Sequence, residues 1–324
     1  MSQDEAPIQV RVIQKRLEAD GIVSLQLRAV DGGALPVFAA GAHIDLILAP
    51  DLVRQYSLCP PLPEADVYEV AELREPESRG GSRAVHEGLQ VGEVIEISQP
   101  RNHFPLKPGA GRTLLLAGGI GITPILAMAE EAAESGRSFE MHYCARSPAR
   151  MAFQDRISRG RIGPHCAFHF DDGADEQKLD FAGLLASPAQ EDQLYICGPG
   201  GFIEAVLGAA LACGWSEAQL NREFFSAPAA QRGESDQAFT VVLGRSGKAV
   251  QVGVGVSIVE ALEPVGVLIP TSCSEGICGM CVVSVLEGEP DHRDFVLGAQ
   301  ERASNNCLTA CCSRAKSPVL VLDL

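Results

Sequence analysis

The stretch "CSEGICGMC", residues 273–281, places three cysteines within nine positions and decides how the C-terminal third of the chain folds. Such a loop suits a zinc site, a disulfide loop or an iron–sulfur cluster. Zinc sites more often use two separate Cys-x₂₋₄-Cys pairs, and here only Cys278 and Cys281 form such a pair. The first residues, "MSQDEAPIQV", lack the basic and apolar regions of a signal peptide, so we expect reduced thiols rather than disulfides.

The cysteine spacing favours a [2Fe–2S] cluster. Four residues separate Cys273 from Cys278, two separate Cys278 from Cys281, and Cys311 follows after a gap of 29 residues. Plant-type [2Fe–2S] clusters combine such close spacing with one distant thiolate. We therefore predict an iron–sulfur site and keep zinc as the alternative.

Glycines in the loop suit an anionic cluster, because its sulfurs favour backbone N–H donors. Gly276 and Gly279 would let the main chain come close enough to supply them. Spacing alone leaves the fourth ligand open among Cys307, Cys311 and Cys312, which all lie within reach.

The residues before the loop predict a small domain. "FTVVLGRSGKAVQVG" favours a β-hairpin, and "SIVEALEPVG" favours a short helix. The stretch "SAPAAQRGESDQA", residues 226–238, is small, polar and contains proline, so we interpret it as a linker. We expect the cysteine-rich domain to cover residues 228–324.

Two other sequence patterns precede the cysteine-rich domain. Between residues 8 and 100, short apolar runs such as "HIDLILAP" and "EVIEISQP" alternate with turn signals, which is typical of an antiparallel barrel or sandwich. From Arg112, strand-like runs alternate with helical ones such as "TPILAMAEEAAESG", which predicts a parallel α/β sheet. We expect domains over residues 1–108 and 109–227.

"RQYSL", residues 54–58, carries side chains that one flavin could use. Arg54 could hold a phosphate in a bidentate fork, Tyr56 could stack on or hydrogen-bond the flavin, and Ser57 could approach its reactive nitrogen. An ordinary edge strand is the alternative. "RGGS", residues 79–82, supports the flavin interpretation, because Gly81 and Ser82 would present N–H groups to an anion where a short helix begins.

"LLLAGGIGITPI" reads as a strand, a glycine turn and a helix start. Gly118, Gly119 and Gly121 would let a pyrophosphate approach the turn. Thr123 is expected at the N-cap and Pro124 at the first helical position. The run differs from the G-x-G-x-x-G fingerprint of Rossmann dehydrogenases.

"YICGPGG" places Cys197, Gly198 and Pro199 at the carboxyl end of a later strand, the edge at which α/β sheets bind ligands. At the end of the second strand, "CARSPAR" offers Arg146 and no acid for a ribose. Because a basic residue could accept a 2′-phosphate, the residues leave NADH and NADPH open.

Composition limits the partners. The chain has 324 residues, 46% of them hydrophobic, and a formal net charge of −16. That charge disfavours nucleic acid and anionic membranes as partners. The longest apolar runs are too short or too interrupted by glycine to span a bilayer, so we expect a cytoplasmic protein.

The C-terminal segment "CSEGICGMCVVSVLEGEPDHRDFVL", followed by "CCSRAKSPVLVLDL", resembles the ferredoxin domain of the phthalate dioxygenase reductase family. The pair "GGIGITP" and "CGP" is similar to the signature of the ferredoxin–NADP reductase superfamily, to which that family belongs. The resemblance covers nearly the whole chain. It implies a multidomain fold: an antiparallel β-barrel flavin domain, an α/β parallel-sheet nicotinamide domain and an α+β plant-type (β-grasp) ferredoxin domain.

The resemblance also implies roles for single residues. In the family the last iron ligand lies three residues before the arginine of an "SRAKS"-like run, which is Cys311 here. The resemblance implies that the flavin is FMN and that Cys197 lies beside the nicotinamide ring. With the motifs above, the catalytic residues expected are Ser57 and Cys197, and the iron ligands are Cys273, Cys278, Cys281 and Cys311. The cofactor contacts expected are Arg54, Tyr56, Ser57, Gly81, Ser82, Gly118, Gly119, Gly121, Thr123, Pro124, Arg146, Cys197, Gly198, Pro199 and Phe225.

The function implied is a reductase that passes electrons from NAD(P)H through FMN and a [2Fe–2S] cluster to a terminal Rieske non-haem iron oxygenase or demethylase. Family membership favours NADH, although the acidic residue that members tend to show near Ser147 is missing. One alternative is a reductase for a cytochrome P450 or another haem acceptor. Another is a non-catalytic iron–sulfur or zinc interaction module.

Overall fold

The structure is a computed structural model of the chain. It describes residues 6–50, 52–60, 66–76, 80–109, 111–226 and 236–324. The chain divides into two compact units, Met1–Glu223 and Phe224–Leu324. Arg79 of the expected phosphate motif and residues 227–235 of the expected linker lie outside the described residues.

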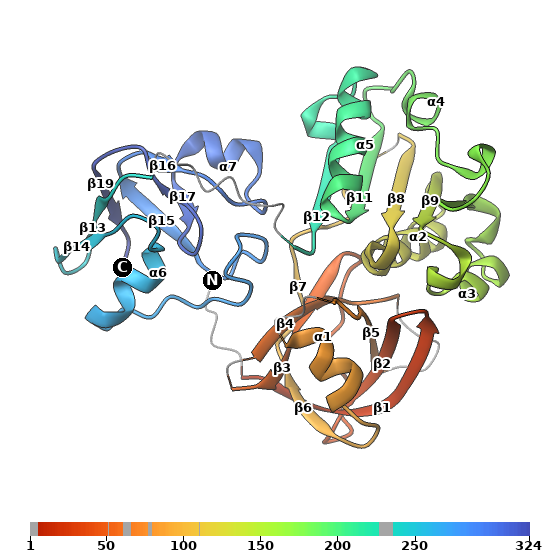
Figure 1. Cartoon of the computed structure of the whole chain (residues 1–324), viewed down its shortest axis with the longest axis horizontal. Coiled ribbons are helices and arrows are strands. Elements are labelled where there is room, and N and C mark those ends of the chain that lie inside the picture. The colour runs from red at the N-terminus through yellow and green to blue at the C-terminus, as the bar shows by residue number, and fades with distance from the viewer. Residues whose placement is uncertain (1–5, 51, 61–65, 77–79, 110, 227–235) are drawn as a thin grey trace. The chain divides into compact units, whose positions relative to one another are not determined.

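The first unit begins with an antiparallel barrel (Figure 1). Its strands follow the order β4-β3-β6-β1-β2-β5, with β7 paired to β3, and a bridge between Leu58 and Val70 links the two ends. Val10 and Val12 of β1 are buried and Arg11 between them is exposed, as in a half-buried strand. The strands are β1 (Ile8–Ala19), β2 (Ile22–Ala29), β3 (Ala42–Ala49), β4 (Leu52–Ser57), β5 (Val67–Leu73), β6 (Val94–Ile97) and β7 (Arg101–Asn102).

The short helix expected after the "RGGS" run is present. It consists of α1 (Gly81–Arg83), which continues into a π-helical turn, Ala84–Gly88. Lys15 of β1 holds its far end, because the ammonium donates to carbonyl oxygens that the helix leaves without an internal partner. These belong to Val85, His86 and Leu89, at 2.8, 2.7 and 2.8 Å.

A five-stranded sheet follows in the first unit, in the order β10-β9-β8-β11-β12. The pairs β10–β9, β8–β9 and β11–β8 run parallel. All of β8 is buried, as in a strand covered on both faces, and helices α2 and α5 contact the sheet. The strands are β8 (Thr113–Gly118), β9 (Phe139–Ala145), β10 (Cys166–Phe170), β11 (Gln193–Gly198) and β12 (Leu220–Phe224). The helices are α2 (Ile122–Glu134), α3 (Gln154–Arg159), α4 (Phe181–Leu185) and α5 (Gly200–Ala212).

Helix α2 begins earlier than the sequence predicts. Gly119–Gly121 forms a 3₁₀ turn, and the helix starts at Ile122 directly after it. Thr123 and Pro124 therefore lie inside the first helical turn, not at the N-cap and first position, and that prediction was wrong. The Thr123 hydroxyl donates back to the Ile120 carbonyl at 3.2 Å, so the 3₁₀ turn makes a polar N-cap side chain unnecessary.

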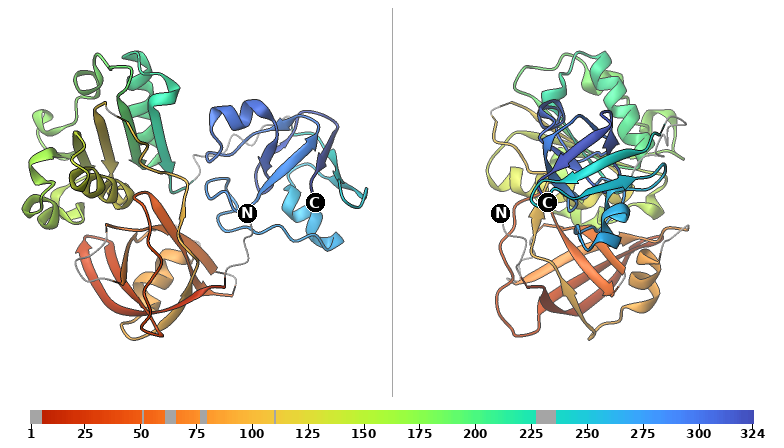
Figure 2. Two further views of the ribbon diagram at one scale, coloured as in Figure 1. Left: turned by 180° about the vertical axis from the view of Figure 1, so that it is seen from behind. Right: turned by 90° about the vertical axis from the view of Figure 1, so that its left-hand side faces the viewer.

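The second unit contains a five-stranded sheet in the order β14-β13-β19-β15-β17, in blue and cyan in Figure 2. The expected hairpin is present as β13 and β14, and β13 also pairs in parallel with β19. A capping box at Ser257 starts the expected short helix α6. The elements are β13 (Phe239–Leu243), β14 (Ala249–Val252), α6 (Ile258–Leu262), β15 (Val282–Glu287), β16 (Pro290–Asp291), α7 (Ala299–Ser304), β17 (Cys307–Thr309), β18 (Arg314–Ala315) and β19 (Val319–Leu322).

These sheets confirm the expected fold class of barrel, parallel α/β sheet and small α+β domain. Within the part of the chain that the structure describes, none of the helices has the length and apolar character needed to cross a membrane.

Candidate functional site

Arg54 of β4 packs against the start of α1. A Cβ atom at Gly81 would lie 2.6 Å from Arg54 Cγ and 2.8 Å from its Nε, so a larger residue there would displace the Arg54 side chain. Gly80 precedes it at φ 96°, a conformation that favours glycine. Ser82 is buried, and its Oγ accepts the Glu75 N–H at 3.1 Å while its O–H can still donate. A guanidinium beside the first N–H groups of a helical segment has the chemistry that a phosphate needs.

Tyr56 has a half-buried carboxyl as its neighbour. Its side chain hydrogen-bonds with Glu72 of β5. Burial, helped by nearby Glu75, raises the pKa of Glu72 to about 8, and burial also raises the pKa of Tyr56. The Glu72 carboxyl therefore keeps its proton at neutral pH. The sequence does not reveal Glu72, because an acid within "DVYEVAEL" looks like any solvent-facing residue of a strand.

Three strands of the first unit bring Ser57, Cys197 and Glu223 together. The Ser57 hydroxyl donates to Glu223 Oε2 at 3.4 Å. Cys197 at the end of β11 is fully buried, and burial is the main cause that raises the pKa of its thiol. Burial raises the pKa of Glu223 to about 8. The arrangement places a protonated thiol, a hydroxyl and a protonated carboxyl at one location.

Glu223 is the functional residue that motif reading misses. It belongs to β12, and its partner Ser57 lies 166 positions earlier in the chain. The one available signal is an acid directly before two phenylalanines in "NREFF", which is unusual for a solvated side chain.

The glycines of the nicotinamide motifs serve two purposes. A Cβ at Gly121 would lie 2.3 Å from the Cys197 carbonyl oxygen, and a Cβ at Gly198 would lie 3.0 Å from Gly118 Cα. These glycines therefore let two strand ends pack against each other. Gly119 differs, since its φ is 53° and its Cβ direction faces open space. It is the glycine best placed for a ligand to approach.

Two expected contacts lie on the surface. Arg146 is exposed directly after β9, and its carbonyl accepts the Asp172 N–H at 3.1 Å. Phe225 follows β12 in the second unit and is 39% exposed. Thr123 and Pro124 are buried in α2, where they pack rather than face solvent.

The cluster loop, residues 273–281, brings its thiols to Cys311. Cys273 hydrogen-bonds with Cys278 and Cys311, and Cys281 hydrogen-bonds with Cys311. The structure thus gathers the expected ligands from two segments that 29 residues separate. The thiols meet in pairs, and in the described ranges no three histidine, cysteine or carboxylate side chains surround a single point as one metal ion would need.

Backbone donors surround these sulfurs. The N–H of Glu275 donates to Cys273 Sγ at 3.3 Å, and the N–H of Ile277 also donates to it. Gly276 and Gly279 have φ of 75° and 73°, so the turns that aim these groups inward require glycine. The loop therefore fits an anionic cluster, whose sulfurs accept such hydrogen bonds.

The structure separates the three candidates for the fourth ligand. Cys311 contacts the loop thiols, as described above. Cys312 lies behind the loop, where it hydrogen-bonds with Thr309 at 3.1 Å, and a Cβ at Gly276 would lie 2.4 Å from its sulfur. Cys307 pairs with Ser284 on the adjacent strand β15. This arrangement favours Cys311.

The residues between the ligands are partly accessible. Ser274 is exposed, and Glu275, Ile277 and Met280 are half-buried. The loop therefore has an accessible edge, although neither apolar side chain projects fully into solvent.

Known proteins share this architecture. A family model described as the 2Fe-2S iron-sulfur cluster binding domain matches residues 241–316. The vanillate O-demethylase oxidoreductase of Pseudomonas sp. (strain HR199 / DSM 7063) is 48% identical over 98% of this chain and 100% of its own length. The structure of phthalate dioxygenase reductase, described as modular for electron transfer from pyridine nucleotides to [2Fe-2S], superposes with a TM-score of 0.72 at 34% identity and covers 99% of both chains.

A second solved structure adds a different context. An intact type IV self-sufficient cytochrome P450 monooxygenase superposes with a TM-score of 0.90 at 39% identity over 98% of this chain. The match spans 41% of that longer protein. Identity at this level over the full length confirms the family suggested by the cysteine, glycine and arginine motifs. The chain belongs to the phthalate dioxygenase reductase family of oxidoreductases, together with the vanillate O-demethylase oxidoreductases.

Proposed function

We propose that this oxidoreductase takes electrons from NADH and delivers them, through FMN and a [2Fe–2S] cluster, to a terminal Rieske non-haem iron oxygenase or demethylase. The observation that carries the proposal is the gathering of Cys273, Cys278, Cys281 and Cys311, in a chain whose other unit contains the Arg54–Gly81 and Ser57–Cys197–Glu223 sites. We propose domains over residues 1–108, 109–227 and 228–324 for the flavin, the nicotinamide and the cluster.

The flavin site consists of residues that bind and orient. Arg54 holds the phosphate with the N–H groups of Gly81 and Ser82, while Tyr56 and Ser57 on the same strand line the ring. Bound FMN would accept hydride from the nicotinamide and release electrons singly to the cluster. The Glu72 carboxyl, neutral because burial raises its pKa to about 8, places no negative charge beside Tyr56 at neutral pH.

The nicotinamide site uses the carboxyl edge of the parallel sheet. Gly119 gives the pyrophosphate access, and Arg146 lies at the same edge on the adenosine side. Cys197 remains an uncharged thiol at the ring because burial raises its pKa. Glu223 holds a proton next to Ser57, so it would place no negative charge beside the flavin, which gains negative charge when it accepts hydride.

The cluster site uses four thiolates and the surrounding N–H groups. Cys273, Cys278, Cys281 and Cys311 would hold the two irons, and the turns at Gly276 and Gly279 supply hydrogen bonds to the sulfurs. Such reduced thiolates suit the cytoplasm, where we place the protein.

Visible spectra of the purified protein test this function. Flavin bands with an iron–sulfur shoulder are expected, and anaerobic NADH should bleach both. The reduced protein should then deliver electrons to the oxygenase component of a vanillate O-demethylase. A colourless protein that contains zinc would contradict the proposal and favour an interaction module.

A haem acceptor is the second candidate, and one observation favours it. The P450 structure that matches contains a homologous segment over 41% of its length, so this architecture occurs joined to a haem domain. Rates of electron delivery to a P450 haem domain and to a Rieske oxygenase, measured side by side, decide between the acceptors.

A further inference from the structure

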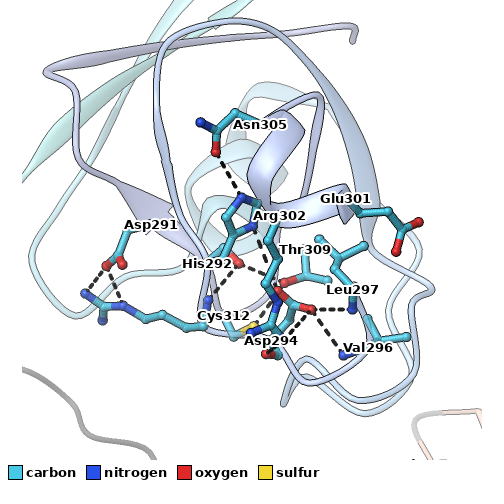
Figure 3. Close-up of polar contacts among 12 residues, drawn as sticks. Asp291, His292, Asp294, Val296, Leu297, Glu301, Arg302, Asn305, Thr309 and Cys312 are labelled. Atoms are coloured by element: carbon cyan, nitrogen blue, oxygen red, sulfur yellow. Dashed lines mark hydrogen bonds and ion pairs between the residues drawn. The ribbon is translucent and has the colours of Figure 1, made fainter. Parts of the chain in front are cut away.

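The segment Asp291–Leu297 lies against the back of the cluster loop. The N–H of Phe295 donates to the Gly276 carbonyl at 2.9 Å. A Cβ at Gly276 would lie 3.0 Å from Asp294 Cα and 2.4 Å from Cys312 Sγ. The turn at Gly276 therefore packs closely against both Asp294 and Cys312. Figure 3 shows these two residues next to each other.

Asp294 fixes the shape of this segment. Its side chain is fully buried, and Oδ1 accepts the N–H groups of Val296 at 3.1 Å and Leu297 at 2.7 Å (Figure 3). Arg302 of α7 donates to the Asp294 main-chain carbonyl and lies 3.6 Å from Oδ1. A buried carboxylate is costly unless it is paired and hydrogen-bonded, so these contacts retain the charge in this place.

The other oxygen of the carboxylate is less compensated. Asp294 Oδ2 has no hydrogen-bond partner among the described residues, and His292 Nδ1, also without one, faces it at 3.9 Å. His292 Nε2 lies 3.2 Å from Asn305 Oδ1, an oxygen that can only accept, so Nε2–H donates this hydrogen bond and Nδ1 carries a lone pair when the ring is neutral. The carboxylate thus keeps much of its negative charge, and a low-dielectric interior transmits it to the adjoining loop.

We propose that Asp294, held by Arg302, is a positioning residue for the cluster: it fixes the Gly276 turn whose N–H groups face the sulfurs, and its buried charge lowers the cluster's reduction potential. The inference rests on the proposed function. Reduction adds one electron, and therefore one negative charge, to a cluster that is already anionic. A fixed carboxylate nearby disfavours that added charge, whereas hydrogen bonds to the sulfurs favour it.

The test compares Asp294→Asn with Asp291→Asn in the full-length protein. Asp291 belongs to the same segment, but it is 32% exposed and pairs with Arg293 at 2.8 Å instead of contacting the loop. Anaerobic titration followed by electron paramagnetic resonance measures the potential. For Asp294→Asn we expect reduction to become at least about tenfold more favourable, which is about 59 mV upward for one electron, with an altered resonance line shape. Asp291→Asn should stay close to the parent.

Arg302→Gln distinguishes the effect of charge from the effect of loop geometry. It removes a positive charge, so it should move the cluster's reduction potential downward. Hydrogen exchange of the amides of residues 275–279 should accelerate in both Asp294→Asn and Arg302→Gln. Unchanged potential and exchange in Asp294→Asn would overturn the proposal, as would shifts of the same sign in both variants. If Asp294→Asn loses its iron, the sign of the Arg302→Gln shift decides. Absence of a cluster in the parent would instead contradict the proposed function.

Discussion

The two units of the chain place cysteine in opposite environments. In the first unit, Cys197 is fully buried at a strand end, and burial raises the pKa of its thiol. In the second unit, hydrogen bonds with Cys278 and Cys311, together with backbone N–H groups, lower the pKa of Cys273, and the same contacts raise the pKa of its two partners. At Cys197 burial outweighs a hydrogen bond with the Gly198 backbone, whereas at Cys273 hydrogen bonds outweigh burial. The balance of burial and hydrogen bonds, not the residue type, distinguishes the packed cysteine from the one in the cluster loop.

The largest expected effect concerns the cysteines of the second unit that are expected to bind iron. Cys311→Ser should lose the iron and the colour of the cluster, because it removes one of four thiolates. Cys307→Ser and Cys312→Ser should keep both. NADH should still reduce a small flavin-level acceptor in Cys311→Ser, since the flavin site belongs to the other unit. Iron analysis and visible spectra decide, and full cluster retention in Cys311→Ser would refute the assignment.

The next effect concerns how firmly the first unit holds its cofactor. Arg54→Ala removes a charge-assisted contact of about 1.5–3 kcal/mol, which is about a ten- to hundredfold loss of flavin affinity. Ser82→Ala should cost less. Arg83→Ala, which removes an exposed arginine from the same helix, serves as the control. Flavin titration of the flavin-free proteins measures the affinities. If Arg54→Ala binds flavin as tightly as the parent, the flavin phosphate does not bind at Arg54.

A smaller effect follows from the half-buried carboxyl of Glu223, near Cys197. The pKa of Glu223 is raised to about 8, so the group holds its proton below that pH and loses it above. The rate of flavin reduction by NADH should therefore fall by about tenfold per pH unit above pH 8, since an ionised Glu223 next to Ser57 disfavours the negative charge that the flavin gains. Glu223→Gln cannot ionise and should give a flat profile. Glu204 is exposed, so Glu204→Gln serves as the control and should show the same decline in rate as the parent in stopped-flow measurements. If the rate also declines above pH 8 in Glu223→Gln, a group other than Glu223 causes the decline.

The smallest effect concerns the accessible edge of the cluster loop. Glu275→Lys and Met280→Ala should slow electron delivery to the partner oxygenase by about two- to fivefold, because rim charges act mainly on association rate. Reduction of the flavin by NADH should not change. Stopped-flow traces at two salt concentrations separate the charge effect from the apolar one. Equal slowing of both reactions, or of neither, would place the exit surface elsewhere.

Sites built from one loop could be predicted from the sequence, and sites assembled from distant strands only in part. The spacing around Cys278 and the glycines at 276 and 279 define the cluster loop locally, so the motif contains most of the information. Ser57 and Glu223 meet only because β4 and β12 fold toward the same place. No local sequence pattern predicts the contact between these two residues.

The misplaced start of α2 has a similar cause. Thr-Pro is a good local signal for an N-cap, yet Gly121 is pressed against the Cys197 carbonyl oxygen, and this tertiary contact favours a 3₁₀ turn instead. The glycines follow the predicted order of strand, turn and helix, and several of them also let two strand ends pack closely. The sequence shows where glycines occur, but only the fold shows which contacts require them.

The position of β19 has a consequence for biosynthesis. This strand, Val319–Leu322, lies between β13 and β15, which the ribosome produces long before it. The two earlier strands cannot acquire their shared neighbour until residues 319–322 have left the exit tunnel, whereas the barrel can close while translation continues. The sheet of the second unit can therefore be completed only after its last strand has been synthesised, and a ribosome stalled before residue 319 would carry a finished barrel together with a thiol-rich segment whose sheet is still open.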